Sequence, residues 1–145
     1  MSKVKIHPAT MEDAIEVASN LLPDDYREVV EGHRHCPLLH IPQYVLGSDS
    51  VYFTMPNGKT AGLAGICKDN SIWMLCTPVI KDYPISFARN AKQFLKKRPE
   101  KILWNMVDKR NTTHIKLLRF LGFKFLRELQ HGPNNLTFIE FVSLC

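Results

Sequence analysis

Long apolar runs are missing from this chain of 145 residues. No stretch approaches the roughly 18 apolar residues that a membrane-spanning helix needs. The first residues, MSKVKIHPATMEDA, also lack the apolar middle of a signal peptide. We therefore expect no membrane insertion and a cytoplasmic location. The apolar content of 45% is ordinary for a globular protein, and the length fits one domain over residues 1–145.

Cysteine pairs with metal-binding spacing are also missing. The four cysteines are scattered, which without a secretory signal favours reduced thiols over a disulfide framework: Cys36, Cys67, Cys76 and Cys145. Residues 33–36, His-Arg-His-Cys, with His40 nearby, are the one zinc candidate. Alternate residues of a strand point to opposite sides, and Pro37 and Pro42 favour an irregular loop that extends to about residue 43. We predict no metal site.

Positive charge is scarce in the first part of the chain. Residues 1–80 carry 6 Lys and Arg against 9 Asp and Glu, whereas residues 81–145 carry 13 against 5. The basic part could attract polyanions such as nucleic acid, an acidic protein or cofactor phosphates. Several of its cations follow helix ends, where the helix dipole favours them, so a solvated face is the simpler explanation. We do not expect a nucleic acid partner.

Secondary-structure signals alternate along the chain. An Asn57-Gly58 turn joins strands at 51–55 and 60–67, because both residues tolerate positive φ. Thr10 caps a first helix that runs to about residue 22, and Pro84 lies near the start of a helix at 83–97. Asn111 caps a helix at 112–121, which ends at Gly122. The remaining prediction is strands at 3–7, 72–76, 102–107, 123–130 and 136–142, and a helix at 26–31 after an interruption at Pro23.

One segment resembles a known family. Asn111 and Leu121-Gly122-Phe123 resemble the end of the GCN5-related N-acetyltransferase (GNAT) core, and with Trp104-Asn105 and His114-Ile115 they keep the spacing seen in small phage members of that family. The resemblance is nearest to the small GNAT-like proteins of short-tailed bacteriophages, including the internal virion protein group, and covers residues 72–142. It implies an α/β fold of the mixed α+β kind, with a central twisted sheet of six to seven strands and helices on both faces.

The resemblance also implies a cofactor site. In the family, acetyl-CoA lies between splayed fourth and fifth strands, here 72–76 and 102–107. The implied contacts are the backbone of Leu75, Cys76 and Thr77 and the side chain of Asn111. From their chemistry and their position near a helix start, Lys81, Ser86 and Arg89 could also hold the cofactor's phosphates. No metal or prosthetic group is implied.

Two departures from the family concern its chemistry. The pyrophosphate turn should contain glycine, yet residues 78–86 have none, so the backbone cannot easily approach a phosphate. The usual general acid is a tyrosine, and its position holds Leu118, which cannot donate a proton. His114 is a catalytic candidate, although a histidine on an apolar helix face is also typical of a core. Tyr83 is a weaker candidate, as are Cys76 and Asp108.

Two functions remain open at this stage. The first is transfer of an acetyl group from acetyl-CoA to an amine by a phage-type protein. The second is a catalytically inactive protein of the same fold that serves as a virion component or binds a host protein. A phage-encoded chain would lie in the host cytoplasm or in the virion. An enzyme should keep an open cleft between the two central strands, whereas a binding module could fill this gap with Trp73, Met74 or Met106.

Overall fold

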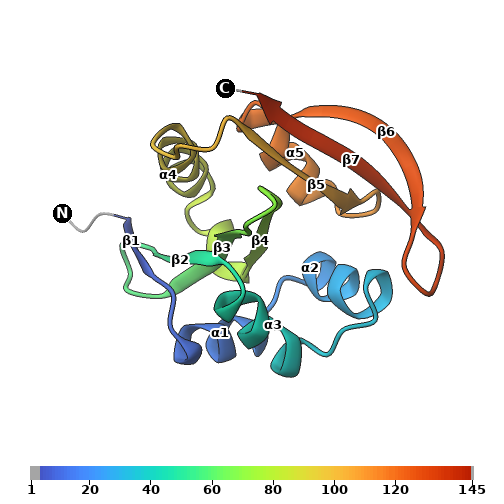
Figure 1. Ribbon diagram of the computed structural model, residues 1–145. Coiled ribbons are helices and arrows are strands. Elements are labelled where there is room, and N and C mark those ends of the chain that lie inside the picture. Colours follow the sequence, from blue (N-terminus) through green and yellow to red (C-terminus); the bar gives the residue numbers. More distant parts are fainter. Residues whose placement is uncertain (1–3, 145) are drawn as a thin grey trace.

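The computed structural model describes residues 4–144 (Figure 1). Its helices are α1 (Met11–Ala18), α2 (Pro23–Arg27), α3 (Pro37–Leu46), α4 (Pro84–Lys96) and α5 (Thr112–Phe120), with a π-helical turn η1 (Glu28–Gly32) and a 3-10 turn η2 (Pro78–Lys81). Its strands are β1 (Lys5–Pro8), β2 (Asp49–Thr54), β3 (Thr60–Ile66), β4 (Ile72–Cys76), β5 (Ile102–Asp108), β6 (Lys124–His131) and β7 (Leu136–Leu144). Lys3, the start of the predicted first strand, lies outside the described residues. Within residues 4–144, no helix combines the length and the apolar character that crossing a membrane requires.

The seven strands form two antiparallel sheets. One has the order β1-β2-β3-β4 and the other the order β5-β7-β6. The sheets are joined where Ser71 and Trp104 make a parallel bridge, beside the starts of β4 and β5. The predicted mixed sheet of six to seven strands is therefore confirmed, with a parallel junction at its centre.

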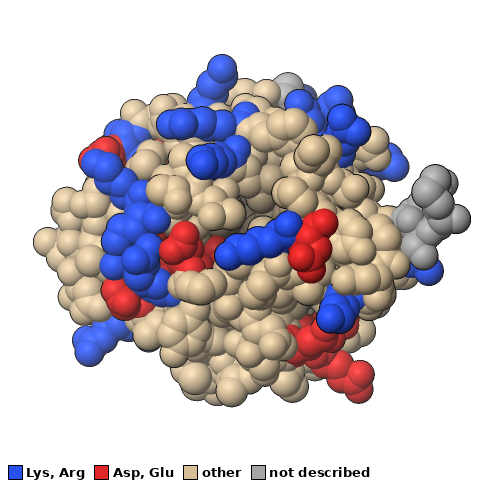
Figure 2. All heavy atoms as spheres, turned by 180° about the vertical axis from the view of Figure 1, so that it is seen from behind, with Lys and Arg blue, Asp and Glu red and all other residues tan. Residues whose placement is uncertain are grey.

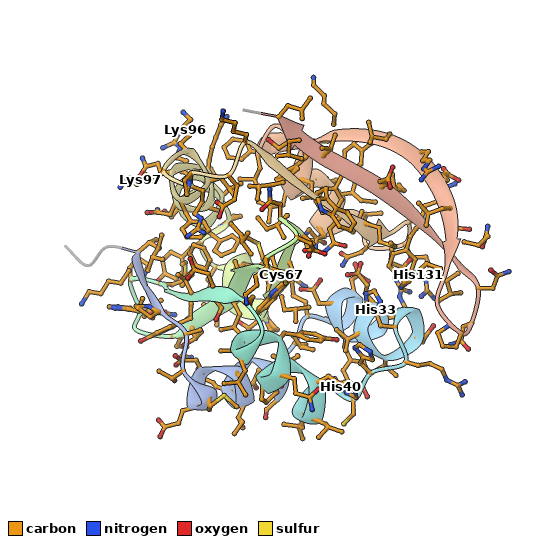
Figure 3. The ribbon with its side chains drawn as sticks, in the orientation of Figure 1. His33, His40, Cys67, Lys96, Lys97 and His131 are labelled. Carbon is orange, nitrogen blue, oxygen red and sulfur yellow. The ribbon has the colours of Figure 1, made fainter. Side chains whose placement is uncertain are left out.

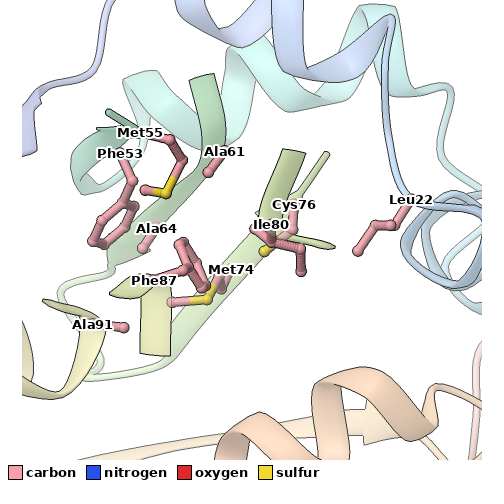
Figure 4. Close-up of a cluster of buried hydrophobic side chains, with 10 residues drawn as sticks. All are labelled: Leu22, Phe53, Met55, Ala61, Ala64, Met74, Cys76, Ile80, Phe87 and Ala91. Carbon is pink, nitrogen blue, oxygen red and sulfur yellow. The ribbon is translucent and has the colours of Figure 1, made fainter. Parts of the chain in front are cut away.

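Helices cover both faces of the first sheet (Figure 1). On one face, Leu63 and Leu75 pack against Val17 of α1 and Ile41 of α3. On the other face, Met74 and its neighbours pack with Phe87 of α4 in the cluster that Figure 4 shows. Adjacent residues of β4 serve different faces because side chains alternate along a strand. A third cluster, which includes Leu118 of α5, covers the second sheet.

Local sequence accounts for several of these elements. The Thr10 hydroxyl accepts a hydrogen bond from the Asp13 N–H, and the Asp13 carboxylate accepts one from the Thr10 N–H, so the pair caps α1. The β2–β3 hairpin turns at Gly58, whose φ of 82° suits glycine. Both predictions are confirmed.

The predicted loop up to residue 43 is wrong. Residues 37–46 form α3, because Pro37 occupies a first-turn position where an N–H is not needed. Pro42 lies inside the helix and removes a hydrogen bond to the carbonyl of Leu38, which lies in an exposed turn. Burial of Ile41 and Val45 against α1 offsets that loss.

The predicted break between the first two helices exists but lies earlier than Pro23, since α1 ends at Ala18. Pro23 is the first residue of α2, which continues without a break into the π-helical turn η1. In that turn the His33 N–H donates to the Glu28 carbonyl at 3.1 Å, a spacing of five residues. The hairpin of β6 and β7 packs on this turn: a Cβ on Gly132 would lie 2.0 Å from the Gly32 carbonyl oxygen. The site is built around this α2–η1 segment.

Candidate functional site

Strands β4 and β5 separate directly after their bridge. The Trp104 N–H still donates to the Asn70 carbonyl at 3.3 Å. At the next step the Asn105 side chain takes over: its Nδ2 donates to the Ile72 carbonyl at 2.7 Å, and its Oδ1 accepts from the Met106 N–H at 2.8 Å. A side-chain amide thus stands where a parallel ladder would bond backbone to backbone, and a gap opens between the strands.

Two buried carboxyl groups occupy the wider part of this gap. Asp25 Oδ2 accepts the Cys76 N–H of β4 at 2.8 Å, and Glu28 Oε1 accepts the Asp108 N–H of β5 at 2.8 Å. Their exposed fractions are 3% and 8%. Asp25 and Glu28 are three residues apart on one helical face, so Asp25 can bind β4 while Glu28 binds β5.

Asn111 connects this pair to α5. Its Nδ2 donates to Asp25 Oδ1 at 2.8 Å, while its Oδ1 accepts the His114 N–H at 3.2 Å and caps the helix. His114 Nδ1 lies 3.8 Å from Asp25 Oδ1, a distance for a charge interaction rather than a direct hydrogen bond. Asp25, Glu28, Asn111 and His114 therefore form one polar cluster inside the fold.

The cluster shifts the proton affinity of two of its members. Burial raises the pKa of Glu28 to about 7, against the opposing charge of His114 and the Asp108 N–H. Burial alone lowers the pKa of His114, but the Asp25 and Glu28 carboxyl groups outweigh it, so the pKa lies above the usual 6.5. A carboxyl group that titrates near neutral pH is suited to act as a general base.

A cavity lies on each side of the gap. The first, of about 410 Å³, lies between η1, α3 and the two strands, and is lined in part by Glu28, Trp73, Met74 and Met106. The second, of about 290 Å³, lies between α4 and α5, and is lined in part by Asp25 and Asn111. His114 lines both. The gap side chains named from the sequence thus form walls of a cavity and leave space beside them.

Four of the predicted site residues meet at the second cavity: Cys76, Lys81, Asn111 and His114. The Cys76 N–H faces the gap but is bonded to Asp25, and its carbonyl accepts the Leu22 N–H at 2.9 Å. Burial raises the pKa of the Cys76 thiol, which keeps it protonated and unreactive.

Of the other predicted residues, Leu75 lines the first cavity and the rest line neither. The Thr77 N–H donates to the Ala61 carbonyl at 2.8 Å, so the backbone groups of Thr77 and Leu75 face β3 rather than the gap. Tyr83, Ser86 and Arg89 line neither cavity, although Pro84, Phe87 and Ala88 beside them line the second. Asp108 pairs with Arg110 at 2.7 Å, and this partner outweighs burial to lower the pKa of Asp108.

The connection after β4 contains no glycine, and it forms a 3-10 turn where the family has its glycine-containing turn. Thr77 Oγ1 accepts the Val79 N–H at 3.3 Å and caps the 3-10 turn η2. In place of a backbone cradle, the second cavity has two cationic side chains in its lining, Lys81 and Lys116. Lys and Arg side chains also spread over the face seen in Figure 2.

Sequence reasoning missed Asp25, Glu28 and Asn105. Two signals were available: acids three residues apart after a proline that can begin a helix, and an asparagine within an apolar strand. Neither signal identifies the partners, since Asp25 and Cys76 are 51 residues apart.

Histidines gather beside the first cavity. His33 Nδ1 and His131 Nε2 lie 2.9 Å apart (Figure 3), and the rings of His35 and His40 stack with centroids 4.2 Å apart. Burial, followed by the neighbouring His131 and His35, lowers the pKa of His33 to about 4. Across residues 4–144, no three His, Cys, Asp or Glu side chains are arranged to hold a metal ion.

Comparison with known proteins shows the fold. The sequence matches no family profile and no curated protein. The structure is similar to a GNAT-family acetyltransferase from Bacillus anthracis, with a TM-score of 0.72 and 12% identity over 99% of this chain and 95% of the other. It is also similar to a GCN5-related N-acetyltransferase from Kribbella flavida, with a TM-score of 0.68 and 14% identity over 98% of each chain.

A third similar structure is yncA from Salmonella typhimurium with its cofactor acetyl-CoA. Its TM-score is 0.68 and its identity 12%, over 99% of this chain and 94% of the other. The chain therefore has the GNAT fold, as the segment from Trp104 to Phe123 indicated.

Proposed function

We propose that this protein is an acetyltransferase that binds acetyl-CoA in the second cavity and transfers the acetyl group to an amine in the first. The observation that carries the proposal is the pair of cavities on opposite sides of the β4–β5 gap, with His114 lining both and Glu28 lining the first. The shared GNAT fold agrees with it.

The cofactor has complementary groups in the second cavity. The ammonium groups of Lys81 and Lys116 would bind the pyrophosphate in place of a glycine turn, and Asn111 lies deeper in the same cavity. Ser86 and Arg89 remain predicted contacts for the outer phosphates, since they belong to the first turns of α4. The Met74 backbone faces the gap, because alternate residues of β4 point to the same side, and its N–H would polarise the acetyl carbonyl.

The amine nitrogen must lose two protons in the reaction, and the leaving thiolate must gain one. An amine that enters as an ammonium ion loses a proton to Glu28, which releases it to solvent. The neutral nitrogen attacks the thioester carbonyl carbon, and the C–S bond breaks as the amide forms. The nitrogen gives its extra proton to Glu28, and the leaving thiolate takes one from His114. A proton returning from Glu28 to His114 completes the cycle.

Calorimetric titration with acetyl-CoA tests the cofactor. The expected result is saturable heat from a single site. Release of free thiol, followed with a thiol reagent in the presence of amines, then tests transfer. Absence of heat up to millimolar acetyl-CoA would overturn the proposal.

The second candidate is a protein that keeps the fold without the chemistry, as a phage virion component or a binder of a host protein in the host cytoplasm. Two observations favour it: Leu118 replaces the family's tyrosine and is 3% exposed, and Leu38, Leu39 and Leu46 of α3 are 57%, 60% and 74% exposed. This candidate predicts that acetyl-CoA does not bind and that the chain stays with virion or host proteins during purification.

A further inference from the structure

The first cavity has a one-sided charge. Its lining contains a single acid, Glu28, and no Lys or Arg, among the residues that the structure describes. Three histidines also line it. Burial lowers the pKa of His33 to about 4, and burial followed by His40 lowers the pKa of His35, so neither adds positive charge at neutral pH. The pKa of His114 is raised, but its ring faces the Asp25 carboxylate at 3.8 Å, which balances its charge. A cation is therefore the favoured charged group here, and a carboxylate ligand would meet Glu28 without a partner.

The walls of this cavity are apolar and aromatic. Trp73 and Tyr44 stand together on one wall, with ring centroids 5.9 Å apart and planes at 59°. Phe123 and Phe141 form an edge-to-face pair on another wall, with centroids 5.1 Å apart. Met74 and Met106, whose thioethers adapt to aromatic rings, also line it.

The polar atoms of the Trp73–Tyr44 wall are already engaged. Trp73 Nε1 donates to Ser48 Oγ at 3.1 Å, and the Tyr44 hydroxyl pairs with His35 Nδ1. These rings therefore offer mainly their faces to a ligand. A volume of about 410 Å³ falls within the range of roughly 300–1,000 Å³ typical of small-molecule sites.

We propose that the first cavity selects a primary amine carried on a small aromatic or apolar body, either a free arylalkylamine or the amino terminus of an aromatic residue. The ammonium group binds the Glu28 carboxylate, and the body lies between the aromatic walls and the two methionines. The use of this ligand as an acetyl acceptor rests on the proposed function, whereas its binding does not.

Binding is tested on the whole protein with methyl-labelled methionine and NMR. The probe is 2-phenylethylamine, and its matched ligands are 2-phenylethanol, 3-phenylpropionate and spermidine. The methyl signals of Met74 and Met106 should shift, while those of Met11 on α1 and of Met55, neither of which lines either of the two cavities, should not. The amine should bind about tenfold more tightly than the alcohol, because a hydrogen bond to a charged group is stronger.

The variant Glu28→Gln removes the negative charge from the first cavity while keeping nearly the same side-chain shape. Glutamine keeps an oxygen that can accept the Asp108 N–H, so the local backbone bond is preserved. The amine should lose its advantage over the alcohol in this variant, and Glu16→Gln on the exposed face of α1 should behave as the wild type. The comparison of amine with alcohol on the wild-type protein needs no variant, so it decides the question even where Glu28→Gln fails to fold.

The outcomes separate this inference from the proposed function. Binding of 2-phenylethylamine without any acetylation supports the inference and overturns the enzymatic proposal. Acetylation of spermidine with no shift of Met74 or Met106 by 2-phenylethylamine overturns the inference and keeps the enzyme. Equal binding of the amine and the alcohol, or tighter binding of 3-phenylpropionate, also overturns it. The tetrapeptide Phe-Ala-Ala-Ala distinguishes the two sources: tighter binding than the free amine assigns the site to protein amino termini.

Discussion

The two cavities beside the β4–β5 gap share His114 but differ in charge and in surface. The first is walled by aromatic rings and methionines around one carboxyl group, and the second carries Lys81 and Lys116 near its rim. An amine suits the first, and a ligand with phosphate groups suits the second. A single gap in a sheet thus opens into two cavities of different chemistry, because the buried carboxyl groups of Asp25 and Glu28 lie between them.

The largest expected effect concerns the acid of the first cavity. Glu28→Gln should lower the rate of acetyl transfer roughly a thousandfold, because a general base of suitable pKa is lost. The measurement is thiol release under saturating acetyl-CoA, with Glu16→Gln as the control. Affinity for acetyl-CoA should change little, since Glu28 does not line the second cavity. An unchanged rate would remove Glu28 from the mechanism.

A pH effect on stability should follow from the same carboxyl group. The pKa of Glu28 is raised from 4.5 to about 7 in the folded state, so folding favours the protonated form. This contribution is fully present below pH 4.5 and is lost as the pH rises through about 7. Relative to wild type, Glu28→Gln should therefore gain up to about 3 kcal/mol between these limits.

Urea denaturation at several pH values measures this gain. His33, whose pKa is lowered to about 4, contributes with the opposite sign, so its stability is gained as the pH rises from about 4 to 6.5. When each variant is compared with the wild type at the same pH, the stability contributions of the titratable groups that both proteins share cancel. A flat difference for Glu28→Gln would mean that the Glu28 pKa is not raised.

Loss of the Asn105 side chain should destabilise the fold at the point where the β4–β5 gap begins. Asn105→Ala leaves the Ile72 carbonyl and the Met106 N–H without their side-chain partner. We expect a loss of about 2 kcal/mol in the free energy of unfolding. Asn90→Ala on the surface of α4, which loses one bond to the Ser86 carbonyl, should change it by less than about 0.5 kcal/mol. Equal losses in the two variants would contradict a special role for Asn105.

The smallest effect is expected at the second cavity. The double variant Lys81→Ala, Lys116→Ala should bind acetyl-CoA about tenfold more weakly, with a smaller dependence on salt. Lys96→Ala with Lys97→Ala, at the far end of α4 (Figure 3), removes the same charge and should bind as the wild type. Binding of 2-phenylethylamine should not change in either protein. Equal weakening in both double variants would indicate a diffuse charge effect.

Some of this site was predictable from local pattern. The capping position of Asn111 and the place of His114 three residues later follow from a helix that begins after a polar turn. The hairpin at Gly58 and the proline at the start of α4 follow from turn and helix chemistry in the same way. Helix α3 was missed because its prolines suggested a loop, while burial of Ile41 and Val45 decided the outcome.

Neighbours within a few residues account for the order of most strands and helices, the caps of α1 and α5, and the lack of a glycine turn after β4, so local pattern was enough to predict them. Long-range packing established the rest: Asp25 and Glu28 bind the backbones of two strands, Asn111 holds Asp25, and the gap is divided into two cavities. These partners lie too far apart along the chain for a local pattern to pair them. The Glu28–Asp108 bond joins residues 80 positions apart, and its partner N–H is free only because Asn105 has already opened the sheet.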